Sequence, residues 1–282
     1  MQSSPLQMPK LGTNPMILQS YTFSSLAQRF GTSRGYFCGR KDNTPPCVAL
    51  KKSAMNLNTP VSVSTCDPYL DRPPVAIYVH GLASGANATT FNKLAKRFLQ
   101  FIWMSADFGE ELAENVQQLN DMILSNYPQL IVGTSMGGLT VLYADAPNAV
   151  KVVCNPALSI ADSVRHTIGL GEHPYFCRRL DGKTTFVLTE AMCQAYEAYI
   201  ATHTPSSSRA NYAVFAAHDE LLGDDAAAAA QALLSKSDYR ILVDPTGAHR
   251  LQPSTIGLIA EIIDTEHFSG ISVHNCEQPT EK

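Results

Sequence analysis

The sequence predicts an α/β fold with a mostly parallel sheet covered by helices on both faces, and two observations support this prediction. First, six short apolar runs follow one another from Val75 onward, and segments of helical pattern separate them. Second, the runs lack in-out alternation, which is typical of strands that are buried on both faces. Repeated strand–helix alternation favours right-handed crossovers within one sheet. We therefore expect a sheet of six strands or slightly more.

The six expected strands end in Gly, Ser, Asp or Asn, residue types that commonly begin turns. Their runs are VAIYVHG, FIWMSAD, QLIVGTS, VKVVCNP, YAVFAAHD and YRILVD. The intervening helical segments include FNKLAKRFLQ, EELAENVQQLNDMILSN and DDAAAAAQALLSK. Polar residues at the carboxyl ends of parallel strands lie at one edge of a sheet, so we expect functional side chains at this edge.

Composition divides the chain near residue 74. Residues 1–73 are rich in Ser, Thr, Pro and Asn and show little apolar period, so we expect a poorly defined N-terminal extension there. Residues 74–282 carry the expected α/β domain. Within it, residues 157–211 contain no clear strand of the sheet and predict a helical insertion. Such an insertion forms a lid over a binding site in one interpretation, and simply covers the sheet in the other.

Global composition excludes several classes of protein. The net charge of -4 provides no basic field for nucleic acid or acidic lipid. No apolar run reaches the roughly 20 residues of a membrane-spanning helix. The start of the chain lacks the pattern of a secretory signal, and seven cysteines at irregular spacing do not suggest a disulfide framework or a zinc site. We expect a cytoplasmic protein without a membrane or nucleic-acid partner.

One stretch of the extension leaves an alternative open. FSSLAQRFGTSRGYF, which begins at Phe23, has the Gly and Ser spacing of a helix-turn-helix turn, with Arg29 and Arg34 nearby. A DNA-binding protein would need a second half of the motif and a basic face. A regulator with a DNA-binding N-terminal segment is therefore kept only as an alternative.

The strongest signal is the pentapeptide that runs from Gly133 to Gly137 with Ser135 at its centre. It follows the apolar run QLIV directly and precedes the helical segment GLTVLYADA. G-x-S-x-G in this context is a sharp turn that lifts a nucleophilic serine hydroxyl above the sheet edge. Random order would give roughly 0.08 such pentapeptides in a chain of this composition, so the motif is specific.

A second candidate region begins at His80 and Gly81, where the run VAIYV ends. In folds with this elbow, the loop after such a strand supplies a backbone donor to the developing oxyanion. The expected donors are the N–H groups of Leu82 and of Met136, the residue after the serine. We expect His80 to hold this loop by hydrogen bonding instead of transferring a proton.

The expected general base is His249, which follows the last apolar run and precedes the final helical segment. The acid should lie between the serine and the histidine in the chain. Asp219 ends the run YAVFAA and would fix the tautomer of the imidazole. Asp224, Asp225 and Asp244 are rivals, although the first two look more like an acidic cap of the alanine-rich helix.

Residues 75–251 resemble the small α/β-hydrolases of the bacterial YqiA/YcfP-type esterase family. The similar pieces are VHGLASGANATTFNKL, LIVGTSMGGL, CNPAL, HDELLGDD and GAHRL. The resemblance implies the α/β-hydrolase fold, cofactor-free cleavage of esters or thioesters, and triad roles for Ser135, Asp219 and His249. The long extension and the residues AN-ATT, where the family usually has a Ser-Pro stretch, are departures that leave the substrate open.

The sequence thus predicts a serine esterase that cleaves a small ester or thioester through an acyl-enzyme, without a metal or organic cofactor. The expected partner is a small-molecule ester. Thioesterase, peptidase and acyltransferase activity on the same triad remain alternatives, as does a non-catalytic protein. Acyl and alcohol specificity and the oligomeric state stay open.

Overall fold

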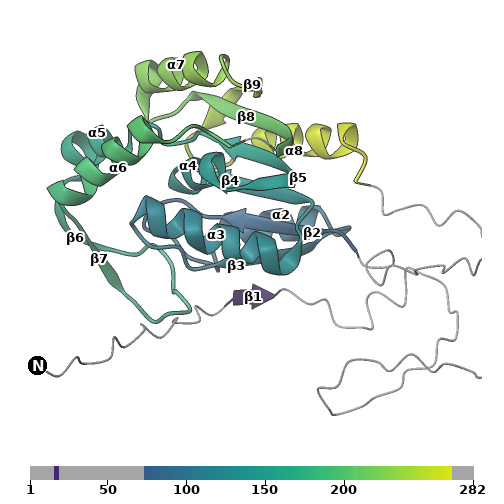
Figure 1. The fold of residues 1–282 in the computed structure, drawn as a ribbon, viewed down its shortest axis with the longest axis horizontal. Helices are drawn as coiled ribbons and strands as arrows, with labels where there is room; N and C mark the ends of the chain where they lie inside the picture. The colour runs from purple at the N-terminus through teal and green to yellow at the C-terminus, as the bar shows by residue number, and fades with distance from the viewer. Residues whose placement is uncertain (1–15, 19–72, 207, 269–282) are drawn as a thin grey trace, which may run out of the picture. The chain divides into compact units, whose positions relative to one another are not determined.

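The computed structural model describes residues 16–18, 73–206 and 208–268 (Figure 1). By its contacts the chain separates into one unit of residues 1–19 and 73–282 and a second unit of residues 20–72. The second unit lies outside the described residues, and so does the stretch from Phe23 that resembles a helix-turn-helix turn.

Seven strands form one sheet, in which every neighbouring pair is parallel except the pair at one edge (Figure 1). The predicted fold class, a mostly parallel sheet with helices on both faces, is confirmed. In spatial order the strands are β1 (Met16–Leu18), β3 (Ile102–Ala106), β2 (Val75–Val79), β4 (Leu130–Thr134), β5 (Ala146–Cys154), β8 (Ser208–His218) and β9 (Arg240–Ala248).

The helices cover the two faces of this sheet and create two separate apolar cores. Residues of β2 alternate between them: Ile77 and Val79 belong to one core, Ala76 and Tyr78 to the other. Fully burying a side chain of this size contributes about 1.5–3 kcal/mol. The first core includes α3 (Leu112–Asn126), α4 (Met136–Tyr143) and α7 (Gly223–Leu234), and the second includes α2 (Thr89–Arg97) and α8 (Pro253–Thr265).

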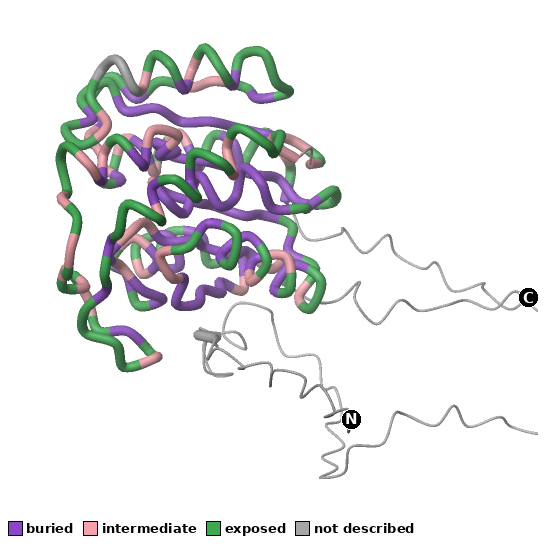
Figure 2. Tube along the Cα trace, turned by 60° about the vertical axis from the view of Figure 1, so that its left-hand side comes forward, coloured by how far each residue is buried: buried purple, intermediate pink, exposed green. Residues whose placement is uncertain are grey.

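Burial follows this layered arrangement. Figure 2 shows the buried residues concentrated in the strands and in the inner faces of the helices, with exposed residues on the outside. The central strand β4 is buried at all five positions. This explains its continuous apolar sequence, because a strand between two helical layers has no solvent-facing side. None of the helices in the described ranges is long and apolar enough to span a membrane.

The insertion between β5 and β8 is more varied than the predicted helical segment. Besides the helices it contains an antiparallel hairpin, which the sequence did not indicate because each strand has only four residues and the first includes Gly171 and Pro174. Figure 1 shows these elements together at the left-hand side of the sheet. They are α5 (Ile160–Ser163), the π-helical turn η1 (Val164–Ile168), β6 (Gly171–Pro174), β7 (Thr185–Leu188) and α6 (Glu190–Thr202).

The strand β1 also differs from expectation, since residues 1–73 predicted no strand. Met16–Leu18 pairs antiparallel with β3, in register from Met16 opposite Ala106 to Leu18 opposite Met104. Three residues are too few for a periodic pattern, and the partner strand lies more than eighty residues away in the sequence. The sheet is therefore one strand larger than the six apolar runs.

Candidate active site

Ser135 occupies a strained turn between β4 and α4. Its φ of 55° and ψ of -120° lie outside the conformations that side-chain-bearing residues ordinarily adopt. The two flanking glycines are required by space. A Cβ on Gly133 would lie 2.4 Å from the Gly137 carbonyl oxygen, and one on Gly137 would lie 2.1 Å from the Val79 carbonyl oxygen. The backbone of β2 thus presses against the turn, and the serine stands at the carboxyl edge of the sheet.

Asp219 and His249 are brought together at the same edge, after β8 and β9. The Nδ1 of His249 lies 2.9 Å from each carboxylate oxygen of Asp219. The Asp219 side chain is only 2% exposed, and its Oδ1 also accepts hydrogen bonds from the backbone N–H groups of Leu221 and Leu222 at 3.0 and 2.8 Å. Because the carboxylate accepts these bonds, Nδ1 is the protonated nitrogen toward Asp219 and Nε2 is free for other chemistry.

These contacts set the charge of Asp219. Burial acts to raise the pKa of its carboxyl, but the hydrogen bonds from His249 and from the Leu222 and Leu221 amides outweigh it and hold the pKa below its ordinary value. The carboxylate is therefore ionised at neutral pH and available to stabilise a positive charge on the imidazole. Such an aspartate is suited to support a histidine base and not to take its proton.

Asn155 connects the histidine loop to the serine turn, and the sequence did not single it out. It follows β5 with a φ of 46°, a left-handed conformation that asparagine tolerates better than most residues. Its Nδ2 donates to the carbonyl oxygens of Ala248 and His249, each at 3.2 Å, while its Oδ1 accepts from the Ala216 N–H at 2.8 Å. The side chain thereby joins the ends of three strands and holds the backbone of His249.

Two residues on either side of Asn155, Cys154 and Ala157, form backbone hydrogen bonds with Ser135. The Ser135 N–H donates to the carbonyl oxygen of Cys154 at 2.9 Å, and the Ala157 N–H donates to the carbonyl oxygen of Ser135 at 3.2 Å. Serine and histidine thus share a support in the segment after β5. No hydrogen bond joins the Ser135 hydroxyl to the His249 ring in the described structure, and in structures without substrate this contact is often long.

The rival aspartates are placed elsewhere. Asp244 is fully buried in β9, where its carboxylate accepts hydrogen bonds from the hydroxyl groups of Thr246, Ser254 and Thr255. It fastens the start of α8 and makes no hydrogen bond to His249. Asp224 and Asp225 lie in the first turn of α7. Of Asp219 and Asp244, whose side chains the structure describes, Asp219 is the one bonded to His249.

The loop after β2 lies directly against the serine. A Cβ on Gly81 would meet the Ser135 Cβ at 3.2 Å, so the loop and the turn are in van der Waals contact. Met136 is the first residue of α4, where N–H groups have no partner within the helix. No described residue accepts a hydrogen bond from the Leu82 or the Met136 amide. The two amides that the sequence predicts as oxyanion donors are thus without a hydrogen-bond acceptor among the described residues.

His80 is held on both ring nitrogens. The Phe108 N–H donates to Nε2 at 3.0 Å, so Nδ1 carries the proton and donates to the Gly81 carbonyl oxygen at 2.8 Å. Burial lowers the pKa of His80 from 6.5 to about 4, which keeps the ring neutral at pH 7. A neutral histidine with both nitrogens engaged holds the loop in place, as its position in the His-Gly turn suggested.

The buried His80 predicts a loss of stability in mild acid. Its pKa is about 4 in the folded protein and near 6.5 in the unfolded chain, so the unfolded chain binds the additional proton as the pH falls from 6.5 toward 4. This corresponds to about 3 kcal/mol, lost progressively across that range. Urea denaturation at several pH values should show a shallower pH dependence for His80→Gln than for the wild type. If the free energy of unfolding falls equally with pH in both proteins, His80 is not the source of the lost stability.

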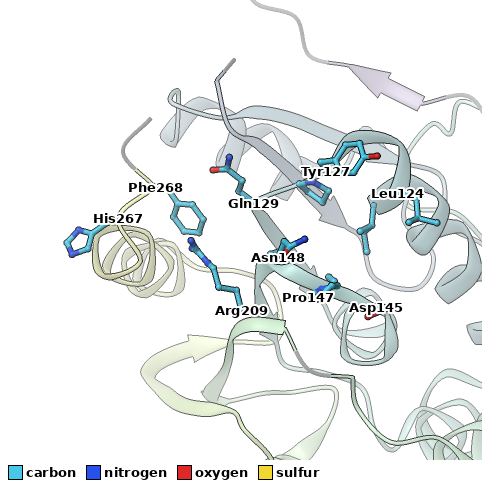
Figure 3. Close-up of a pocket in the computed structure, with 13 residues that line it drawn as sticks. Leu124, Tyr127, Gln129, Asp145, Pro147, Asn148, Arg209, His267 and Phe268 are labelled. Carbon is cyan, nitrogen blue, oxygen red and sulfur yellow. The ribbon is translucent and has the colours of Figure 1, made fainter. Parts of the chain in front are cut away.

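A large cavity lies away from this site, at the opposite ends of the strands. It measures about 570 Å³, and Figure 3 shows Gln129, Asn148, Arg209 and Phe268 among its lining residues. Asn148 is near the start of β5 and Arg209 near the start of β8, whereas Ser135 follows the end of β4. The cavity therefore does not serve the serine.

The sequence matches the model of one protein family. The model of a family described as "Uncharacterised protein family (UPF0227)" matches residues 75–252. No curated protein matches the chain.

The structures of one protein, Est1E, share the fold, and a lipase aligns with a lower TM-score that does not bear on the fold. Est1E from Butyrivibrio proteoclasticus aligns over 71% of this chain and 89% of its own, with 15% identity and a TM-score of 0.50. The structure of Est1E with bound ferulic acid aligns over 70% of this chain and 89% of its own, with 14% identity and a TM-score of 0.51. A monoacylglycerol lipase from Paleococcus ferrophilus covers 67% of this chain and 92% of its own, at 16% identity and a TM-score of 0.47. At these sequence identities, the alignments with Est1E show a shared fold and nothing about a shared activity.

Proposed function

The chain belongs to the uncharacterised protein family UPF0227, and from this premise we propose that it is a serine hydrolase of the α/β-hydrolase superfamily that cleaves carboxylic esters or thioesters. One observation carries the proposal. A buried, ionised Asp219 binds the Nδ1 of His249 at 2.9 Å, at the same sheet edge as Ser135 in its strained turn. A paired carboxylate and imidazole at the same sheet edge as a half-buried serine are the parts of an acyl-transfer site.

The proposed reaction has two steps. The Nε2 of His249 accepts the hydroxyl proton of Ser135 while the oxygen attacks the carbonyl carbon, and the carbonyl oxygen becomes an oxyanion near the Leu82 and Met136 amides. The imidazolium then gives its proton to the departing alkoxide or thiolate, and the acyl group remains on the serine. Water, activated by the same histidine, attacks this ester and restores the enzyme. Asp219 stabilises the imidazolium in both steps.

The leaving group separates the remaining alternatives. Thioesterase, peptidase and acyltransferase reactions begin with the same acylation. A peptidase must protonate a poor amine leaving group, and an acyltransferase replaces water with another nucleophile in the second step. No described residue indicates an amide substrate or an acyl acceptor other than water, so the proposal covers esters and thioesters and leaves peptidase and acyltransferase activity as alternatives.

A pre-steady-state assay tests the proposal. Mixing the purified protein with p-nitrophenyl esters of rising chain length, and with the matching thioesters, should release a first burst of leaving group equal to the enzyme concentration, followed by slower steady turnover. The burst should appear with the acyl lengths that the enzyme accepts. Absence of both burst and turnover across the whole panel would contradict the proposal.

A further inference from the structure

The loop that carries the Leu82 amide is fastened by a buried carboxylate beneath it. Asp107, which follows β3, is 2% exposed, and its Oδ1 accepts a hydrogen bond from the Ala86 N–H at 2.7 Å. Its Oδ2 accepts from the N–H groups of Leu180 and Asp181 at 2.6 and 3.0 Å. Leu180 and Asp181 belong to the insertion, in the stretch between β6 and β7. A single carboxylate therefore joins the loop to the insertion.

Arg179 makes the same connection from the insertion side. Its side chain is 2% exposed, and its Nη1 donates to the carbonyl oxygens of Ser84 and Phe108, each at 2.9 Å. Its Nη2 pairs with the Asp181 carboxylate at 2.8 Å, and the guanidinium lies 4.3 Å from the centre of the Tyr175 ring. The hydrogen bond from Arg179 holds the pKa of Asp181 below its ordinary value, so this partner is charged as well.

The loop is also strained where the insertion contacts it. Ala83 has a φ of 60°, a left-handed conformation that is uncommon for a residue with a side chain. The Phe176 N–H donates to the Ala83 carbonyl oxygen at 2.8 Å and supports this conformation. Close packing leaves no room for a side chain at Gly85, two residues further along the loop. A Cβ on Gly85 would lie 2.9 Å from Asp107 Oδ1 and 3.1 Å from Arg179 Cγ.

We propose that Arg179 and Asp107 form a clamp that positions the oxyanion loop, with Arg179 as a positioning residue for the reaction. The inference rests on the proposed function. An oxyanion donor must lie within about 2.7–3.1 Å of the developing charge, and a misplacement of about 1 Å costs roughly 100-fold. Because residues 176–181 bind the loop directly at Ala83 and Ser84 and indirectly through Asp107, this part of the insertion forms a fixed wall of the proposed site and not a lid that opens.

Arginine is required by the geometry of the clamp. One planar guanidinium reaches the Ser84 carbonyl, the Phe108 carbonyl and the Asp181 carboxylate together, because its donors point in fixed and different directions. A lysine ammonium is a single point of charge on a flexible stem, and cannot span the same partners. The clamp therefore predicts that Lys at position 179 replaces the charge without restoring the function.

The test compares Arg179→Gln and Arg179→Lys with a matched control, Arg165→Gln. Arg165 lies in the same insertion and pairs with Glu190 and Glu197, but does not contact the loop. With active sites counted by the burst, we expect both Arg179 variants to lose roughly 10- to 100-fold in kcat, with KM within about threefold of the wild type. The midpoint of the pH–rate profile should not move, because the Asp219–His249 pair is untouched. Arg165→Gln should stay within about twofold.

A second variant keeps the test decisive if the Arg179 variants fail to fold. Gly85→Ala removes no charge and wedges a methyl group between the loop and the clamp, so it should also lower kcat. Hydrogen exchange should rise in the peptide that contains residues 81–86 for Gly85→Ala, and not in the peptide of α6. Wild-type kcat in Gly85→Ala, or in a folded Arg179→Lys, would overturn the clamp.

Failure of the proposed function gives a different result. In that case the wild type itself shows neither ester turnover nor labelling by a fluorophosphonate. Hydrogen exchange then tests the clamp alone, and exchange of residues 81–86 that is unchanged in Gly85→Ala would overturn it.

Discussion

Ester hydrolysis should disappear in Ser135→Ala, with any residual rate at the level of the background reaction without enzyme. Alanine keeps the backbone of the turn and removes the one oxygen that forms the acyl-enzyme. Labelling by a fluorophosphonate should vanish with the activity, because the same oxygen attacks the phosphorus. Circular dichroism and the thermal midpoint should stay close to those of the wild type, since no hydrogen bond of the described structure depends on this hydroxyl.

Ser125→Ala is the matched control for this loss. Ser125 lies on α3, where its hydroxyl donates only to the Asp121 carbonyl oxygen at 2.7 Å, far along the chain from the elbow. This variant should label and turn over as the wild type does. A Ser135→Ala protein that is labelled fully at another serine would show that the nucleophile has been misassigned.

Asp219→Asn should lower kcat by about 10⁴ while the protein remains folded. The amide nitrogen of asparagine donates a hydrogen bond where the carboxylate accepted one, so it favours the imidazole tautomer with Nδ1 as acceptor and the proton on Nε2. That tautomer cannot take the serine proton, and the charge that stabilised the imidazolium is lost. His249→Ala should cost a similar factor, because it removes the base itself.

Asp244→Asn controls for the loss of a buried aspartate. Asp244 is fully buried like Asp219, but its partners are Ser254, Thr255 and Thr246 and it does not bind His249. This variant should lose stability, measured by urea denaturation, and keep its kcat per folded molecule within about threefold. If Asp244→Asn loses activity as Asp219→Asn does, the assignment of the acid is wrong.

The sheet could be predicted, and the three candidate residues could be proposed, because their signals are local. The run before Ser135 is buried on both faces and therefore apolar throughout, and the glycines of the elbow are required by backbone contacts within a few residues. Asp219 and His249 could be placed because each follows a strand, and parallel strands end at one edge. Chain order then limited the choice of acid.

The supports of the site could not be predicted, because they depend on contacts between distant segments. Asn155 binds the carbonyl of His249, 94 positions along the chain, and Arg179 binds the carbonyl of Phe108, 71 positions away. Nothing in the neighbouring residues specifies either partner. CNPAL is one of the segments that resemble the family, but its asparagine gains a role only because the fold places β5, β8 and β9 side by side.

Mass spectrometry of the acyl-enzyme tests the central proposal most directly. The wild type is mixed with a p-nitrophenyl ester that gives a burst, quenched in acid within the burst phase, digested and mapped. We expect a mass increase equal to one acyl group on the peptide that contains Ser135, and none in Ser135→Ala. An acyl group on another residue, or turnover with a burst but no acylated peptide, would contradict it.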